Sequence, residues 1–287
     1  MPKVAYHLIF PQKRTTSVVF ASPHSGRDYP DWFLKRSRLN EKTVRSSEDA
    51  FVDRLFCAAP QMGAPFIKAG APRAFIDLNR GMDELDPALV EGVRQCGHNP
   101  RVASGLGVVP RVVANGQAIY NGKLTREEVD LRIDTYWRPY HDALRGQLDQ
   151  AHAMFHEAIL VDCHSMPHEA MDSVARAAGS RPQVVLGDRF GASADREIVD
   201  RIEAAFVTAG LRVARNTPFA GAFITQHYGR PGRRRHAVQV EIDRSLYMDE
   251  RRIVPNDNFE TFQAVLRSVI AEIAEIGRRA DQALAAE

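Results

Sequence analysis

The sequence predicts an α/β fold in which a mixed, mostly parallel sheet carries helices on both of its faces. Three observations lead to this prediction: short apolar or β-branched runs recur along the chain, amphipathic helical segments separate them, and the two patterns alternate. The predicted buried strands cover residues 17–20, 66–68, 74–78, 158–162, 184–186, 211–214 and 237–242. The predicted helices cover residues 47–60, 125–157, 193–209 and 258–285.

Ser47 and Thr125 supply the start signals for the first two of these helices. Thr125-Arg126-Glu127-Glu128 forms a capping box, in which a threonine and a glutamate three residues later satisfy free backbone N–H groups. A long segment at residues 81–122, rich in glycine, proline and asparagine, has weak periodicity and is typical of an insertion near a site. No repeat or linker divides the chain, so we expect residues 1–287 to form a single domain.

Composition excludes several classes of protein. The 287 residues are 44% hydrophobic and 26% charged, which excludes a disordered chain. The net charge is only +2 and the densest basic cluster, at residues 233–235, is one short run, so we expect no nucleic-acid partner. The apolar runs are too short for a membrane span, and the N-terminus lacks the pattern of a secretory signal. We therefore expect a cytoplasmic protein.

The cysteines predict neither disulfides nor a thiolate metal site. Cys57, Cys96 and Cys163 are an odd number and lack CxxC spacing, so we interpret them as small buried residues.

Polar side chains follow three of the predicted strands. Residues 22–26 read Ser-Pro-His-Ser-Gly, residues 162–165 read Asp-Cys-His-Ser, and residues 79–80 are Asn-Arg. In an open α/β sheet, ligands bind beyond the carboxyl ends of the strands, so we expect these groups to meet at one rim.

His24 and His164 are the first candidates for metal ligands. Two histidines and one carboxylate are the protein ligands of many catalytic zinc sites, which leave a fourth position open for water. Glu48, Asp49 and Asp53 all lie in the helix that Ser47 is predicted to cap. Asp49 and Asp53 are one turn apart, so one of them can ligate while the other orients a histidine. Each histidine on its own is equally well explained by a hydrogen bond within a turn.

Glu241, Arg73 and Arg80 are the candidates for the chemistry around a metal. Glu241 lies in the alternating run at residues 238–242 and can act as a general base, or it is simply a solvent-facing strand residue. Arg80 can hold a substrate carboxylate through its planar fork, and Arg73 can polarise a carbonyl oxygen or bind a second carboxylate.

Two rival sites carry less weight. His152 and His156 have the i, i+4 spacing of a helical metal pair, but the glutamate of the HExxH motif is missing, which favours a solvated helix face. Ser25 and Ser165 do not sit in the GxSxG elbow of a serine nucleophile.

Six ordered motifs together make the chain resemble the N-formylglutamate amidohydrolase family, which is related more distantly to the zinc carboxypeptidases and to the aspartoacylase and succinylglutamate desuccinylase group. The motifs are SPHSG with a following Tyr-Pro at 22–30, SEDAFVDRLF at 47–56, PRAFIDLNR at 72–80, DCHSMP at 162–167, residues 216–231, and VQVEIDRSLYMDE at 238–250.

The resemblance implies a phosphorylase/hydrolase-like three-layer sandwich with one zinc ion per chain. It also implies hydrolysis of an N-acyl amino acid, in the name-giving case N-formyl-L-glutamate to formate and L-glutamate, the last step of a route of histidine degradation. By the same resemblance, His24 and His164 bind the zinc ion and Glu241 is the general base.

The remaining residues follow from the resemblance as well. Asn79 and Arg80 match the pair that holds the substrate carboxylate, and Arg73 matches the carbonyl-polarising arginine. The carboxypeptidase-type relatives place a glutamate ligand three residues after the first histidine, but this chain has Arg27 there. We therefore expect Asp49 as the third ligand, with Glu48 as the alternative. Arg27, Arg230 and Arg244 are further candidates for the substrate carboxylates.

Two other functions remain open at this stage. One is a metallo-deacylase or carboxypeptidase with another acyl group or a peptide as substrate. The other is a non-catalytic protein that binds a metal or an amino acid on the same scaffold. The sequence does not give the oligomeric state.

Overall fold

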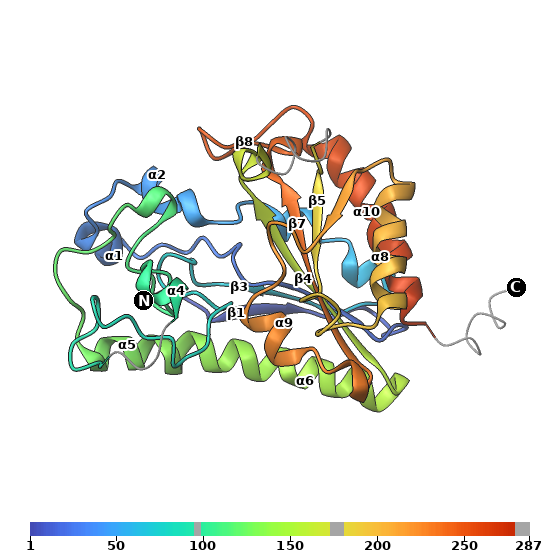
Figure 1. Ribbon diagram of the computed structural model, residues 1–287, viewed down its shortest axis with the longest axis horizontal. Helices are drawn as coiled ribbons and strands as arrows, with labels where there is room; N and C mark the ends of the chain where they lie inside the picture. Colours follow the sequence, from blue (N-terminus) through green and yellow to red (C-terminus); the bar gives the residue numbers. More distant parts are fainter. Residues whose placement is uncertain (95–98, 173–180, 279–287) are drawn as a thin grey trace, which may run out of the picture. The chain divides into compact units, whose positions relative to one another are not determined.

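The computed structural model describes residues 1–94, 99–172 and 181–278 (Figure 1). The strands are β1 (Tyr6–Ile9), β2 (Val18–Ser22), β3 (Phe66–Ala69), β4 (Ala158–Met166), β5 (Val184–Gly187), β6 (Val213–Arg215), β7 (Arg235–Asp243), β8 (Met248–Asp249) and β9 (Val254–Pro255). The α-helices are α1 (Asp31–Arg36), α2 (Glu41–Val44), α3 (Val52–Leu55), α4 (Pro100–Ala103), α5 (Arg126–Arg132), α6 (Arg138–Phe155), α8 (Arg196–Thr208), α9 (Phe223–Tyr228) and α10 (Phe259–Ile276).

The sheet is mixed and mostly parallel, as the sequence predicts. Its seven strands have the order β1-β3-β2-β4-β7-β5-β6, and β8 pairs with β9 in a separate antiparallel ribbon. β4 runs parallel to both β2 and β7, whereas β5 runs antiparallel to β7 and parallel to β6. The central strands β2 and β4 are buried over their whole length, which requires that both faces of the sheet are covered.

The chain divides into two compact units, which we describe separately. Unit 1 comprises Met1–His7, Pro23–Ala50 and Lys68–Ala143, and unit 2 comprises Leu8–Ser22, Phe51–Ile67 and Leu144–Glu287. The single-domain organisation expected from the sequence remains a prediction.

Unit 2 has its core between the sheet and two long helices. Helices α8 and α10 lie side by side, and α8 packs against β5 and β6 while α10 packs against β2 (Figure 1). Helix α10 presents apolar residues at helical spacing, and Leu266, Val269, Ile270 and Ile273 are all fully buried. On the same sheet, α9 packs against β4 and β7.

Unit 1 is organised around a buried arginine inside an aromatic cluster. The guanidinium of Arg132 lies 4.1 Å from the centre of the Phe75 ring and donates hydrogen bonds to the Phe75 carbonyl oxygen and the Tyr120 hydroxyl. Phe33 packs edge-on against Phe75, at 5.3 Å between ring centres. Cation–π contacts and hydrogen bonds together offset the cost of burying this charge.

Most of the predicted elements form as expected. Six of the seven predicted strands correspond to β2, β3, β4, β5, β6 and β7. The long predicted helix at residues 125–157 is α5 and α6, joined by a π-helical turn at Ile133–Trp137. The Thr125 side chain accepts the Glu128 backbone N–H, so the predicted cap is confirmed.

The predicted strand at residues 74–78 is wrong. The Pro72 carbonyl oxygen accepts hydrogen bonds from the backbone N–H groups of Phe75 and Ile76, which closes the chain into a turn. Because a turn uses these groups locally, the segment contributes no strand to the sheet. Its apolar residues are buried nonetheless, which explains the misleading pattern.

The predicted helix at residues 47–60 is also wrong. A 3₁₀ turn covers Arg45–Ser47, and Glu48 is extended, with φ −70° and ψ 136°. Phe51 has a left-handed backbone, with φ +67°, and α3 begins only at Val52. Asp49 therefore precedes the helix, so Asp49 and Asp53 do not share a helix face.

Three smaller expectations need correction or qualification. The last helix ends at Ile276 with Gly277 as its cap, short of the predicted residue 285, and residues 279–285 lie outside the described part of the chain. Cys163 is buried as expected but Cys57 is exposed, and Cys96 lies outside the described residues. None of the described helices combines the length and the apolar character that crossing a bilayer requires.

Candidate active site

His24 is fixed by two buried carboxylates in unit 1. It follows β2 by two residues, and its carbonyl oxygen accepts the backbone N–H of Asp49. Its Nε2 lies 2.7 Å from Oδ1 of Asp77, and its Nδ1 lies 3.5 Å from Oδ2 of Asp49. An ionised carboxylate only accepts hydrogen bonds, so Nε2 donates to Asp77, while Nδ1 faces Asp49.

Asp77 links His24 to an arginine. Its Oδ2 accepts from Nε of Arg73 at 3.2 Å, while its Oδ1 also accepts the Asn79 backbone N–H at 2.8 Å. Burial alone would raise the pKa of that carboxyl, but the charges of His24, Arg73 and Arg80 hold it well below its ordinary value. The Asp77 carboxyl group is therefore ionised at neutral pH and can accept the hydrogen bond from His24.

Gly26 allows the backbone after His24 to pass close to the backbone at Ala71. A Cβ atom at this position would overlap the carbonyl oxygen of Ala71. The glycine of the SPHSG motif is thus needed for a close backbone approach two residues after His24.

In unit 2, β4 and β7 bring four buried polar side chains to one face of the sheet. In the parallel register, Asp162 pairs with Gln239 and His164 pairs with Glu241. Residues two apart on a strand, and residues in register on neighbouring strands, project to the same face. Nε2 of His164 lies 2.9 Å from Oδ2 of Asp162, and Nε2 of Gln239 donates to Oε1 of Glu241 at 2.8 Å.

The second histidine is thus held in the same manner as the first. Its Nε2 faces a fully buried carboxylate, as Nε2 of His24 does. A carboxylate that accepts from the far nitrogen of a metal-binding histidine fixes its tautomer and makes it a stronger ligand.

Three of these side chains can hold a metal ion. One ligand atom each from His24, Asp49 and His164 lies within 4.8 Å of the other two, and all three residues are buried. Two ligands of a tetrahedral zinc ion with bonds of about 2.0–2.2 Å lie roughly 3.3–3.5 Å apart, which agrees with the 3.5 Å between His24 and Asp49. Two nitrogens and a carboxylate oxygen are also a donor set that zinc accepts, so the residues fit this metal.

Glu48, the alternative carboxylate, has other partners. Arg45 donates to both of its oxygens, at 3.0 and 3.3 Å, and the Tyr29 hydroxyl donates at 3.3 Å. Burial raises the pKa of the Glu48 carboxyl. The group of possible metal ligands among the described residues contains Asp49 and not Glu48.

The rival histidine pair does not form a helical metal pair. Helix α6 ends at Phe155, and His156 follows it with φ +59°, so it does not share a helix face with His152. Nε2 of His152 instead lies 3.2 Å from the Arg233 carbonyl oxygen.

Arg73, Asn79 and Arg80, three of the four predicted substrate-contacting residues of unit 1, lie along one short segment. Arg73 also donates to the Ser47 carbonyl oxygen at 3.4 Å. Arg80 is buried and donates to the carbonyl oxygens of Leu106 and Asn79, at 2.9 and 2.7 Å, and burial lowers the pKa of its guanidinium. Arg27 is exposed.

The two candidate arginines of unit 2 lie at opposite ends of β7. Arg244 directly follows the strand and is buried, with its Nε donating to the Ser165 hydroxyl at 3.2 Å. Arg230 forms a bridge with Arg235, the first residue of β7. Glu241 lies six positions beyond Arg235, which is roughly 20 Å along a strand. This distance is too long for Arg230 to contact a substrate held beside Glu241.

Sequence reasoning missed the roles of Asp77, Asp162 and Gln239. It assigned the orientation of a histidine to Asp49 or Asp53, whereas Asp77 and Asp162 orient the histidines. A carboxylate two residues before a histidine in a fully buried strand was an available signal for Asp162. No signal existed for Asp77, because its partner His24 is 53 residues away and the segment was interpreted as a strand.

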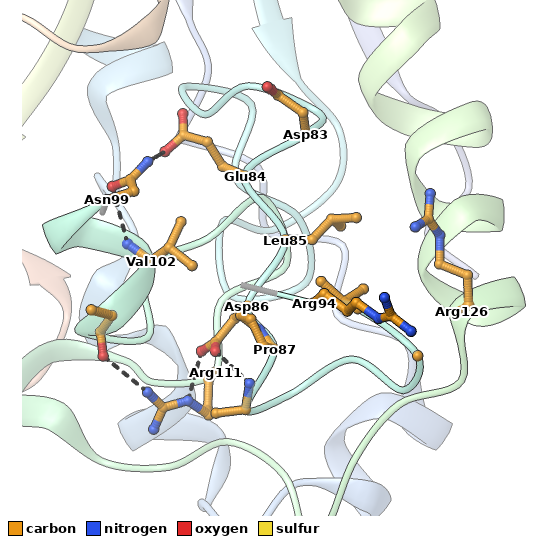
Figure 2. A pocket seen from close by; sticks show the side chains of 14 residues that line it. Asp83, Glu84, Leu85, Asp86, Pro87, Arg94, Asn99, Val102, Arg111 and Arg126 are labelled. Carbon is orange, nitrogen blue, oxygen red and sulfur yellow. Dashed lines mark hydrogen bonds and ion pairs between the residues drawn. The ribbon is translucent and has the colours of Figure 1, made fainter. Parts of the chain in front are cut away.

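The insertion at residues 81–122 contains a separate depression of about 810 Å³ (Figure 2). The polar contacts in its walls include those from Arg111 to Asp86 at 2.7 Å and from Asn99 to Glu84 at 3.0 Å (Figure 2). No predicted site residue lines it.

The chain is similar to known proteins over most of its length. A family model described as N-formylglutamate amidohydrolase matches residues 16–248. N-formylglutamate deformylase of Pseudomonas putida is 31% identical over 240 residues, covering 81% of this chain and 82% of the relative. The protein of the same name from Pseudomonas aeruginosa is 30% identical over 250 residues, with 84% and 86% covered.

A solved structure is similar at the level of the whole chain. The crystal structure of N-formylglutamate amidohydrolase from Ralstonia eutropha JMP134 has a TM-score of 0.87 and 34% sequence identity. The match covers 96% of this chain and 98% of that one.

Replacing Asp77 by asparagine tests the role of the buried carboxylates. We expect Asp77→Asn to bind Zn²⁺ about 10- to 100-fold more weakly, because the acceptor that orients His24 is lost. Competition with a chromophoric chelator measures this, and Asp83→Asn, an exposed aspartate of the same unit, is the matched control. Asp162→Asn should act in the same way through His164. Unchanged zinc affinity in both variants, with unaltered thermal unfolding of the metal-free proteins, would contradict the assignment.

Proposed function

Because the chain belongs to the N-formylglutamate amidohydrolase family, we propose that it hydrolyses N-formyl-L-glutamate to formate and L-glutamate with one zinc ion per chain. The observation that carries the proposal is the grouping of two histidines and an aspartate, with a buried glutamate in register beside one of the histidines. We also place the reaction in histidine degradation, as the resemblance to the family implies, and in the cytoplasm, as expected from the sequence patterns.

The metal would act as a Lewis acid. A zinc ion held by His24, Asp49 and His164 would polarise the scissile carbonyl group and make water a stronger acid.

Glu241 is the group that moves the proton. Hydrolysis of an amide needs a base that takes a proton from the attacking water and an acid that gives one to the leaving amine. We assign both proton transfers to Glu241, first from the water and then to the amine. Its side chain is buried, and a hydrogen bond from Gln239 to its Oε1 fixes its orientation. In the parallel register, the backbone of Glu241 lies one strand spacing, about 4.8 Å, from the backbone of His164, a proposed ligand, and this supports the assignment.

The arginines bind and orient the substrate. We assign Arg73 to the oxygen of the scissile carbonyl, where a fixed positive charge stabilises the oxyanion that forms during attack. Its position is set by the ion pair with Asp77. We assign Asn79 and Arg80 to a substrate carboxylate, with Arg244 and Arg27 as further candidates. Each buried charge-assisted contact contributes about 1.5–3 kcal/mol, or a factor of roughly 10 to 150 in specificity.

A substrate series tests the proposed reaction. We expect the metal-loaded protein to release formate from N-formyl-L-glutamate with a kcat/KM about 10- to 150-fold above that for N-formyl-L-glutamine, which lacks the second carboxylate. Faster turnover of N-acetyl- or N-succinyl-L-glutamate would instead identify a related deacylase. Zinc binding without turnover of any of these compounds would identify the non-catalytic alternative.

Replacing Glu241 by glutamine tests the base. We expect Glu241→Gln to lower kcat about 10²- to 10⁴-fold while its zinc content stays unchanged, because an amide has the same shape but cannot take up the proton. Glu197→Gln, an exposed glutamate on α8, is the matched control and should keep full activity. A Glu241→Gln variant with most of its activity would remove this assignment.

A further inference from the structure

A cation-rich depression of about 280 Å³ lies in unit 2, at the amino end of β7. The residues that line it are Arg145, Asp149, His227, Tyr228, Arg230, Arg233 and Arg235. Arg235 begins β7, whereas Glu241 is six residues further along, or roughly 20 Å. The depression is therefore distinct from the carboxyl end of the strand, where the candidate base lies.

Four guanidinium groups face one carboxylate in this depression. Asp149 accepts a hydrogen bond from Arg235 at 2.7 Å. Arg230 donates only to uncharged acceptors, the carbonyl oxygens of Gln226 and Gly229, at 2.6 and 2.5 Å. Three of the four positive charges therefore lack a carboxylate among the lining residues.

Among the four arginines that line the depression, Arg145 and Arg233 have N–H donors that bind no other group in the described part of the chain. Both are exposed, and within the described part of the chain neither guanidinium forms a hydrogen bond or an ion pair. Their N–H donors are available to an incoming ligand, and recruiting them breaks no existing interaction.

The lowered pKa of His227 is consistent with an excess of positive charge in this depression. Its ring stacks on Phe223 at 4.9 Å between ring centres. Burial lowers the pKa of the His227 imidazole, and the charges of Arg145 and Arg230 lower it further. Like charges thus repel across the depression, and a bound anion would relieve that repulsion.

We propose that this depression binds a small oxyanion of the phosphate class, either free phosphate or the phosphate group of a small metabolite. The planar forks of several arginines match the tetrahedral oxygens of phosphate and give it more donors than a single carboxylate can use. The volume lies just below the range of about 300–1,000 Å³ typical of pockets for drug-sized ligands, which favours a small ligand. This inference does not depend on the proposed hydrolytic function.

Isothermal titration of the full chain with inorganic phosphate, and separately with glycerol 3-phosphate, tests the site. We expect Arg145→Gln and Arg233→Gln each to weaken binding about 10-fold, because each removes one charge-assisted contact. Asp149→Asn should strengthen binding several-fold, because it removes the competing carboxylate. Arg196→Gln, an exposed arginine on α8, is the matched control and should leave the dissociation constant unchanged.

The two ligands and the variants separate the outcomes. Tighter binding of glycerol 3-phosphate than of phosphate would identify a phosphorylated metabolite as the ligand, and the reverse would identify free phosphate. Absence of binding for both ligands, or equal weakening in Arg145→Gln and Arg196→Gln, would overturn the proposal.

Discussion

The parallel register between β4 and β7 is the constraint on which the candidate site depends. Nine consecutive residue pairs, from Ala158 with Arg235 to Met166 with Asp243, fix the two strands relative to each other. A shift by one residue would turn every side chain of β7 to the other face of the sheet. The same register therefore buries the apolar residues of both strands and aligns His164 with Glu241. The length of β7 separates its two ends, so that the cation-rich depression and the candidate base occupy different regions.

Buried carboxylates are the second constraint. Asp77 and Asp162 are almost fully buried, and each accepts from the Nε2 atom of a histidine. A buried charge is costly unless it is paired, so these aspartates hold the two imidazoles in one orientation. In both histidines it is Nε2 that faces the buried aspartate, although one histidine follows a strand and the other lies within one.

The sequence predicts the elements whose patterns are local, and fails where the pattern has another cause. Buried apolar runs identify β2, β4 and β7, and the capping threonine identifies the start of α5. The residues at 74–78 are as apolar as a strand, yet hydrogen bonds to Pro72 close them into a turn. The residues after Ser47 look like a helix, yet the left-handed backbone at Phe51 delays it. Asp77 is visible only in the structure, because its partner is remote in the chain, whereas Asp162 could have been found from its spacing to His164.

The central claim is that His24, Asp49 and His164 bind a single zinc ion, and the stoichiometry of zinc binding tests it most directly. The full chain, freed of metal and then reloaded with Zn²⁺, should retain one zinc ion per chain after gel filtration, as measured by mass spectrometry of the element. His164→Ala should keep the fold, judged by circular dichroism, and retain almost none. A chain that holds no zinc, or a His164→Ala variant that holds as much as the unaltered chain, would contradict the account.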